Sequence, residues 1–184
     1  MSTLLQRIWR PLVLLLDVSG SMADHSRNLL QFAYSMRRAA QKVEVFCFGT
    51  RLTRITPLLD RRSPDAAMRL AADRVVDWDG GTRIGDSLET FVKDWGRRGL
   101  SRGATVIICS DGLDRGDPAT LAEAIEKLER LSHRIVWMNP LHDVHNGPPP
   151  TLAMAVVGPH IDEIASGNNL ASLEAFASRL PQIG

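Results

Sequence analysis

The sequence predicts an α/β protein whose single doubly wound sheet is mainly parallel, with one antiparallel edge strand and helices on both faces. The first reason is a set of short unbroken apolar runs, such as the run from Val13 to Asp17 and the run Thr105–Cys109. Such runs are typical of strands buried on both faces, because polar alternation disappears when neither face meets water. The second reason is the helical periodicity between these runs, since alternating strands and helices imply parallel strands joined by right-handed crossovers.

Length and charge indicate one domain without a general affinity for polyanions. The chain has 184 residues, of which 44% are apolar, enough for a single sizeable core. We therefore expect one domain covering residues 1–184, with its core at about 10–180. Its 22 basic and 21 acidic residues leave a net charge of +1, which argues against nucleic acid or a membrane surface as the partner.

The N-terminal residues and the two cysteines indicate the cellular compartment in which we expect the protein. Met1–Arg10 lacks the apolar core of a signal peptide, and no run of about 18 apolar residues could span a bilayer. Cys47 and Cys109 each lie inside an apolar run, where cysteine behaves as a small hydrophobe. Because their strands would flank the first one, their Cα atoms would be about 9–10 Å apart, beyond bridging reach. We expect a cytoplasmic protein with no membrane span and no disulfide.

The first half of the chain contains a predicted hairpin. After the first strand, apolar residues at helical spacing predict an amphipathic helix over His25–Gln41. Val43–Phe48 follows as a strand, and two residues, one of them glycine, separate it from the alternating run Leu52–Ile55. Such a short connection suggests a tight hairpin, which gives the sheet its antiparallel edge.

The rest of the chain continues the alternation of helices and strands. Ser63 and Pro64 start a helix that we expect to run to about Val76, since serine caps free amides and proline fits the first helical position. The further expected elements are a helix from Ile84 to a stop at Gly96, a strand at Thr105–Cys109, a helix starting at Asp117-Pro118, strands at Arg134–Met138 and Leu152–Val157, and a closing helix at Asn169–Leu180.

Oxygen-bearing side chains follow the first strand directly. In the stretch 17–21, Asp-Val-Ser-Gly-Ser, Asp17, Ser19 and Ser21 alternate along a chain that turns at a glycine. A carboxylate and two hydroxyls can therefore converge just past the carboxyl end of the strand. Hard oxygen donors without Cys or His suit Mg²⁺ or Mn²⁺ better than zinc or copper. For the two serines by themselves, helix or turn capping is an equally good explanation.

The stretch 17–21 resembles the Asp-x-Ser-x-Ser motif of von Willebrand factor A domains, whose metal-ion-dependent adhesion site also takes a threonine and an aspartate from two later loops. Two later stretches have the matching order, 80–85 (Gly-Gly-Thr-Arg-Ile-Gly) and 110–112 (Ser-Asp-Gly). The resemblance implies a Mg²⁺ or Mn²⁺ site whose ligands are Asp17, Ser19, Ser21, Thr82 and Asp111. Doubly wound sheets also bind ligands at the carboxyl ends of their strands, so the general rule and the resemblance indicate the same place.

Four stretches resemble the CoxE-like family of bacterial and archaeal cytoplasmic von Willebrand A proteins. They are 80–85, 109–112 (Cys-Ser-Asp-Gly), 137–141 (Trp-Met-Asn-Pro-Leu) and 168–173 (Asn-Asn-Leu-Ala-Ser-Leu). The resemblance implies an adaptor or co-chaperone that pairs with a MoxR-type AAA+ ATPase in metalloenzyme maturation, with carbon monoxide dehydrogenase as the model client. Family members commonly carry a long helical segment before the A domain, whereas about ten residues precede it here.

The predicted ion has few anionic ligands, which leaves it receptive to a Glu or Asp of a partner protein. We therefore expect a binding protein and not an enzyme. The alternative is a Mg²⁺-dependent hydrolase or phosphotransferase, because Mg²⁺ beside an Asp at a strand end also describes many phosphoryl-transfer sites. The chain has no second carboxylate two residues after Asp17, no Gly-x-x-x-x-Gly-Lys loop and no Gly-x-Ser-x-Gly elbow, which argues against that alternative.

A proline-rich stretch, Pro140–Pro150, holds a second set of candidate metal ligands. His142, Asp143 and His145 could bind copper or nickel. We favour an ordinary exposed polar loop, because two histidines three residues apart in a loop have no fixed geometry.

Overall fold

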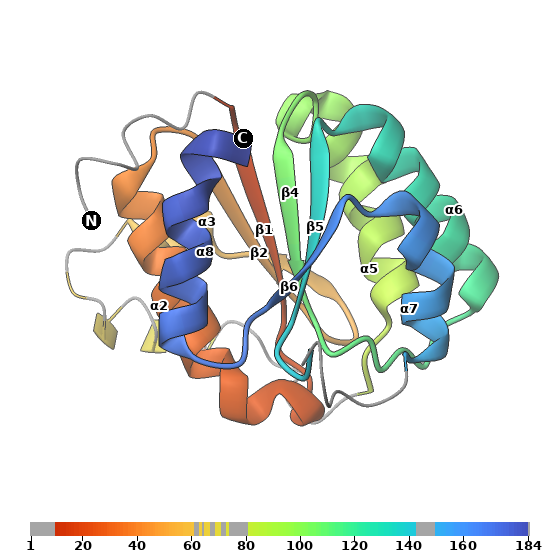
Figure 1. The fold of residues 1–184 in the computed structure, drawn as a ribbon, viewed down its shortest axis with the longest axis horizontal. Coiled ribbons are helices and arrows are strands. Elements are labelled where there is room, and N and C mark those ends of the chain that lie inside the picture. Colours follow the sequence, from red (N-terminus) through yellow and green to blue (C-terminus); the bar gives the residue numbers. More distant parts are fainter. Residues whose placement is uncertain are drawn as a thin grey trace.

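A six-stranded sheet runs through the middle of the computed structural model, which describes residues 10–60, 63, 65–66, 69–70, 73, 81–142 and 150–183 (Figure 1). The strands are β1 (Leu12–Asp17), β2 (Val43–Phe48), β3 (Leu52–Arg54), β4 (Thr105–Cys109), β5 (Arg134–Asn139) and β6 (Glu163–Ser166). Within these residues the strand order is β3-β2-β1-β4-β5-β6, and β3 pairs antiparallel with β2 while every other pairing is parallel. The predicted mainly parallel sheet with one antiparallel edge strand is confirmed.

β1 lies inside the sheet and is buried along its whole length. On either side of it, Leu16 is level with Cys47 of β2 and with Cys109 of β4. The cysteines are therefore two strands apart, and both are free thiols, which confirms the prediction that they form no disulfide. Because β1 and β4 are parallel neighbours, Asp17 and the residues after Cys109 meet at the same edge of the sheet.

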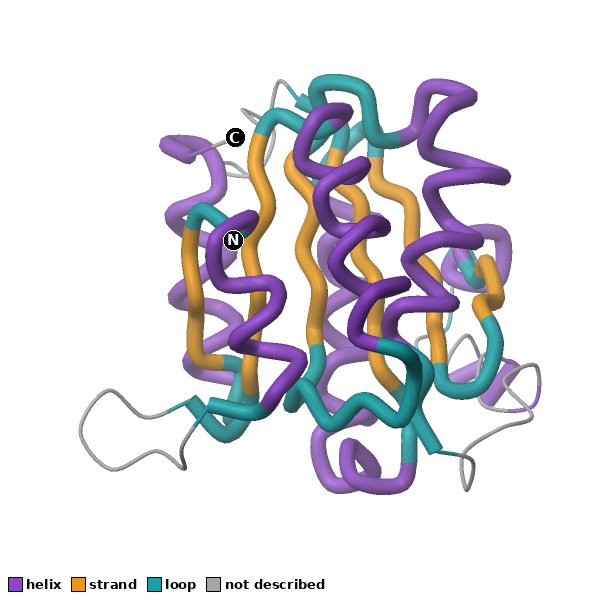
Figure 2. Tube along the Cα trace, turned by 90° about the vertical axis from the view of Figure 1, so that its right-hand side faces the viewer, coloured by secondary structure: helices purple, strands orange, loops and turns teal. Residues whose placement is uncertain are grey.

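Helices cover both faces of the sheet. They are α2 (Ala23–Ala39), α3 (Thr56–Leu59), α5 (Ile84–Phe91), α6 (Pro118–Leu131), α7 (Leu152–Val157) and α8 (Leu170–Ile183), with the tighter turns η1 (Gly20–Met22) and η3 (Gly158–His160) and the wider turn η2 (Val92–Leu100). α2 and α8 lie on one side of the sheet, and α5, α6 and α7 lie on the other (Figure 1). Figure 2 shows the second group in front of the strands.

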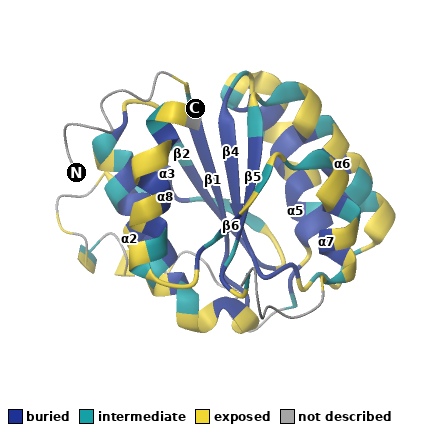
Figure 3. Cartoon of the chain, viewed as in Figure 1, coloured by how far each residue is buried: buried dark blue, intermediate teal, exposed yellow. Residues whose placement is uncertain are grey.

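The unbroken apolar runs of the sequence follow from this two-sided burial. Leu14 and Leu16 of β1 pack in the cluster that includes α2 and α8, whereas Val13 and Leu15 pack in the cluster that includes α5, α6 and α7. Successive side chains of a strand point to opposite faces, so both sets have to be apolar. The central strands are accordingly buried, and the exposed residues lie on the outer sides of the helices (Figure 3).

The predicted start of α6 is confirmed by its capping bond. Asp117 Oδ1 accepts a hydrogen bond from Ala119 N (3.0 Å), and Pro118 occupies the first helical position. α2 begins two residues earlier than expected and ends at Ala39, which is within the usual uncertainty of helix ends.

The predicted strand at Leu152–Val157 is wrong, because this stretch is α7. The Thr151 side chain accepts a hydrogen bond from Met154 N (3.2 Å) and caps the helix. Ala153, Met154 and Val157 are the buried positions of α7, which is a helical spacing. A six-residue apolar run does not distinguish a strand from a short buried helix. The sixth strand is the later β6, Glu163–Ser166.

The predicted helix stop at Gly96 is also wrong. α5 continues as η2 to Leu100, and the glycine with positive φ (117°) is Gly99. Gly96 is buried, and a Cβ there would lie 3.0 Å from Ser101 Oγ. Its glycine therefore serves close packing instead of ending the helix.

Some predicted features lie outside the described residues. The helix expected from Ser63 to about Val76 lies largely outside them, although the Ser63 hydroxyl accepts a hydrogen bond from Ala66 N (3.3 Å), as expected of an N-cap. Gly80, Asp143 and His145 also lie outside them. None of the helices in the described ranges is long and apolar enough to cross a membrane.

Candidate metal centre

Asp17 ends β1 and is completely buried. Its Oδ1 accepts a hydrogen bond from Ser19 N (3.0 Å), and its Oδ2 accepts one from Ser110 Oγ (2.6 Å). Burial raises the pKa of Asp17 to about 6, the hydrogen bonds from Ser110 and Ser19 oppose that rise, and the charge of Asp111 adds to it. Keeping this carboxylate ionised therefore costs free energy, and burial is the larger cause.

Ser19 and Ser21 belong to the turn that follows Asp17. Their hydroxyl oxygens lie 3.2 Å apart, Ser19 buried and Ser21 exposed. Ser19 stands at the N-cap position of η1 without making a side-chain capping bond, and the N-cap residue of α2 is Met22. The capping explanation of the two serines therefore finds no support in their contacts.

Thr82 comes from a loop that is tied to the loop after β4. Thr82 is buried, and its carbonyl oxygen accepts a hydrogen bond from Arg115 N (2.9 Å). Asp114 Oδ1 accepts from Ile84 N (3.0 Å) and so caps the first turn of α5 from another loop. These two hydrogen bonds hold together the loops that supply the second and third stretches of the predicted site.

Asp111 lies in a turn that packs under the start of α7. Its Oδ1 accepts a hydrogen bond from Leu113 N (2.9 Å), and the side chain is buried. Gly112 has a φ of +78°, which glycine adopts without strain, and a Cβ there would lie 2.8 Å from Thr151 Oγ1. Both the backbone conformation and the space require glycine after Asp111.

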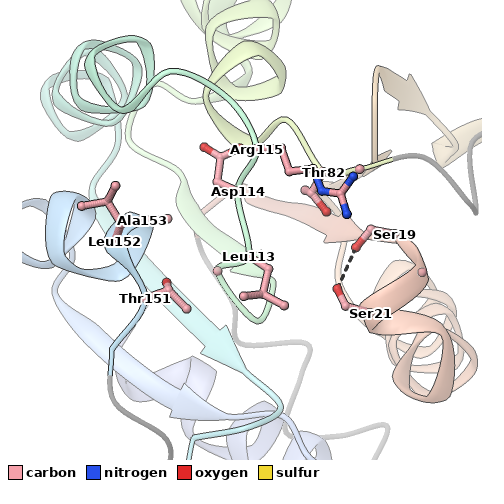
Figure 4. A pocket seen from close by; sticks show the side chains of 12 residues that line it. Ser19, Ser21, Thr82, Leu113, Asp114, Arg115, Thr151, Leu152 and Ala153 are labelled. Carbon is pink, nitrogen blue, oxygen red and sulfur yellow. Dashed lines mark hydrogen bonds between the residues drawn. The ribbon is translucent and has the colours of Figure 1, made fainter.

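A cleft of about 460 Å³ opens at this edge of the sheet (Figure 4). Three of the five predicted ligands line it, and each offers a hydroxyl: Ser19, Ser21 and Thr82. Asp17 and Asp111 are buried and do not line the cleft. The structure thus brings the hydroxyls to one cleft and the two carboxylates close to one another, with Asp17 bonded to the backbone of Ser19.

The donor set fits a hard divalent cation. Two carboxylates and three hydroxyls are oxygen donors of the kind that Mg²⁺ and Mn²⁺ prefer. Among the ion pairs of the described residues, none involves Asp17 or Asp111, so neither carboxylate forms a salt bridge in this part of the chain. The same part contains no cluster of three or more His, Cys, Asp or Glu placed to hold a metal. An ion held here would therefore take most of its ligands from hydroxyls and water.

Sequence reasoning missed two residues that position this site. Ser110 Oγ donates to Asp17 and accepts from Gly112 N (3.0 Å), so it joins the two acidic turns. Asp114 Oδ1 accepts from Gly116 N (2.9 Å) as well as from the first turn of α5. Both lie within three positions of Asp111, but each also bonds to a residue that is distant in sequence, Asp17 for Ser110 and Ile84 for Asp114.

The candidate copper or nickel ligands of the proline-rich stretch are described in part. His142 N donates to Asn139 O (3.1 Å), whereas Asp143 and His145 lie outside the described residues. The copper or nickel site stays a prediction.

The fold and the three stretches at its edge define a von Willebrand factor A domain. Solved structures with this fold include a von Willebrand factor type A protein from Catenulispora acidiphila (TM-score 0.66, 17% identity, covering 94% of this chain and 42% of that one). A second is proximal thread matrix protein 1 from the mussel byssus, with zinc in its metal-ion-dependent adhesion site (MIDAS) motif. Its TM-score is 0.62 and its sequence identity 18%, and the match covers 94% of this chain and 48% of that one. A third is the manganese-loaded TRAP protein of Plasmodium vivax. Its TM-score is 0.62 and its sequence identity 19%, and the match covers 97% of this chain and 74% of that one.

A family model described as VWA domain containing CoxE-like protein matches residues 3–173, and the chain belongs to this family. A search of curated proteins finds no match. The chain spans 42% of the Catenulispora structure and 48% of the mussel structure, so it corresponds to less than half of either.

Proposed function

We propose that this chain is a metal-dependent protein-binding module that holds Mg²⁺ or Mn²⁺ in a MIDAS-type site. The proposal rests on one observation: the hydroxyls of Ser19, Ser21 and Thr82 line one cleft, beside two buried carboxylates that form no salt bridge among the described residues. Two similar folds, the mussel protein with zinc and the Plasmodium protein with manganese, carry metal, which supports the same use here.

Asp17, Ser19, Ser21, Thr82 and Asp111 would hold the ion. The ion would supply a coordination position for an oxygen from outside the chain, most simply a Glu or Asp of a partner. Ser110 keeps Asp17 in place, and the Asp114 and Arg115 bonds hold the Thr82 loop against the Asp111 loop. The two carboxylates at most cancel the charge of the divalent ion, and the other three ligands are neutral, so the ion remains receptive to the carboxylate of an acidic partner.

Binding without turnover is the second part of the proposal. Among the described residues that line the cleft, Asp114 is the one carboxylate, and its Oδ1 accepts from two backbone amides. It is therefore poorly placed to act as a general base. Metal-dependent hydrolysis of phosphate esters or nucleotides that Asp17→Ala abolishes would contradict this part.

The finer proposal is an adaptor or co-chaperone for a MoxR-type AAA+ ATPase in metalloenzyme maturation, with a client similar to carbon monoxide dehydrogenase, acting in the cytoplasm. Membership of the CoxE-like family supports this pairing. The partner would contribute the Glu or Asp that completes the metal site.

Affinity capture with the tagged full chain tests the proposal. The MoxR-type ATPase of the source organism should be retained by the wild type in Mg²⁺ and released in EDTA. Thr82→Ala removes one of the three hydroxyls that line the cleft. It should keep near-wild-type melting in EDTA and lose Mg²⁺-dependent capture.

Thr90→Ala is the matched control, since the Thr90 hydroxyl donates to Asp86 O on an exposed part of α5, away from the cleft. It should capture the ATPase as the wild type does. If Thr82→Ala also captures it equally in Mg²⁺ and in EDTA, an ordinary interface replaces the metal-bridged one.

A further inference from the structure

Arg115 places a positive charge at the same cleft. Its stem packs on Gly81, where a Cβ would overlap Arg115 Cδ and lie 3.1 Å from Nη1. The guanidinium extends beside Thr82 on the side of the cleft that faces Ser19 (Figure 4). Within the described residues, this side chain forms no hydrogen bond and no ion pair, so its N–H donors are available to a ligand.

Two large apolar side chains are exposed at this cleft. Leu113 is 51% exposed and follows the Asp111 turn, while Leu152 is 68% exposed at the start of α7. Figure 4 shows Leu113 between the serines and Thr151. Exposed leucines around a polar centre are typical of an interaction site, because their burial on binding is favourable.

We propose that the cleft recognises a protein segment in which an acidic residue stands next to a large apolar residue. Arg115 donates to the carboxylate of the acidic residue, and Leu113 and Leu152 contact the apolar one. This inference rests on the proposed function, in which the same carboxylate completes the metal site. Arg115 is then a specificity-determining residue, because it adds a directed, charge-assisted hydrogen bond to the coordination bond.

The combination of charge and apolar surface favours a protein segment over other ligands. A free phosphate would leave Leu113 and Leu152 uncovered, and a purely apolar segment would leave Arg115 desolvated without a partner. The volume of about 460 Å³ lies within the range of about 300–1,000 Å³ for ligand sites. Two adjacent side chains can therefore enter together.

Nuclear magnetic resonance titration of the full chain with N-acetyl-Glu-Leu-amide tests the inference. With saturating Mg²⁺, the wild type should show saturable shifts of the Leu113 and Leu152 methyl signals and of Arg115 Nε–H. Arg115→Gln should weaken binding about tenfold, which is typical of losing one charge-assisted hydrogen bond. N-acetyl-Glu-Ala-amide should bind the wild type several-fold more weakly, and Leu152→Ser should abolish that difference.

Arg83→Gln is the matched control, because Arg83 is an exposed neighbour of Thr82 that pairs with Asp86 (3.3 Å) and does not line the cleft. It should bind the probe as the wild type does. Arg115 is exposed, so its variant should melt as the wild type does.

The outcomes separate this inference from the proposed function. If Arg115→Gln binds N-acetyl-Glu-Leu-amide as well as the wild type does, while Thr82→Ala or EDTA abolishes binding, the inference is overturned and the metal-bridged function stands. If binding is equal in Mg²⁺ and EDTA but falls in Arg115→Gln, the Arg115 contact is supported and the metal bridge is not. Absence of saturable shifts at the cleft, or equal shifts with N-acetyl-Gln-Leu-amide, overturns the inference.

Discussion

Asp17 is a completely buried carboxylate that accepts two hydrogen bonds and has no ion-pair partner among the described residues. Since its pKa rises from 3.8 to about 6 on folding, the folded state binds its proton more tightly than the unfolded state does. Stability from this group is fully present below pH 3.8 and is lost as the pH rises through about 6. The loss is on the order of 3 kcal/mol.

Asp17→Asn should therefore become more stable than the wild type as the pH rises, when both are measured in EDTA. Urea unfolding across this pH range should show the difference in unfolding free energy shifting by about 3 kcal/mol in favour of Asp17→Asn. Mg²⁺ should restore the unfolding free energy of the wild type and leave that of Asp17→Asn unchanged, because the ion binds the ionised carboxylate in the folded state. A difference that stays flat with pH would show that Asp17 does not titrate in this way.

At the residue scale, the sequence predicts the candidate metal ligands better than it predicts the residues that hold those ligands in position. Asp17, Ser19 and Ser21 stand in one short motif, and the turn glycines mark the loops of Thr82 and Asp111. Ser110, Asp114 and Arg115 have roles that depend on which loops meet in space, which no local pattern reveals.

At the element scale, Asp114 caps α5 from a different loop, whereas Asp117 caps its own helix, α6. Replacing either by alanine removes one cap, so each variant should lose about 1 kcal/mol of stability in urea. Asp114→Ala should also weaken the Mg²⁺ response of the melting temperature, because the Thr82 loop loses one of its ties to the Asp111 loop. Asp117→Ala should keep that response. Equal Mg²⁺ responses in the two variants would mean that the cap does not position the site.

The elements that sequence reasoning misplaced are short or lie near the edge of the sheet. The sequence of α7 resembles that of a strand, because six apolar residues are too few to show a helical periodicity. The Thr151 side chain caps this helix by accepting a hydrogen bond from Met154 N. β6 has four residues, and Ile164 within it is 41% exposed, so it lacks the apolar run that marks the central strands. Long helices and fully buried strands leave clearer patterns, and apart from the helix stop at Gly96 the sequence predicts those in the described residues.

At the scale of the whole molecule, the alternation of strands and helices predicts a mainly parallel sheet with right-handed crossovers, and the structure places β1 beside β4. Cys47 and Cys109 lie in the two strands that flank β1 and are fully buried. Burial raises the pKa of both thiols well above its usual range. Their reactivity should therefore report opening of the sheet as a whole.

Native protein should react with a thiol reagent such as dithionitrobenzoate only at the rate at which it unfolds, and both cysteines should react at once in urea. Mg²⁺ should slow the native reaction further, since it stabilises the folded state. Rapid labelling of one cysteine in the folded protein would show that the central strands open locally.

The central claim is that five oxygen-bearing residues at the carboxyl edge of the sheet hold one divalent cation. Electron paramagnetic resonance of Mn²⁺ tests it most directly, because the signal of the free aqueous ion falls as the ion binds. We expect one Mn²⁺ per wild-type chain, displaced by Mg²⁺, with about tenfold weaker binding in Thr82→Ala, none in Asp17→Ala and unchanged binding in Asp86→Ala, whose exposed carboxylate is not a ligand. Equal Mn²⁺ binding by the wild type and Asp17→Ala, or none by either, would contradict the claim.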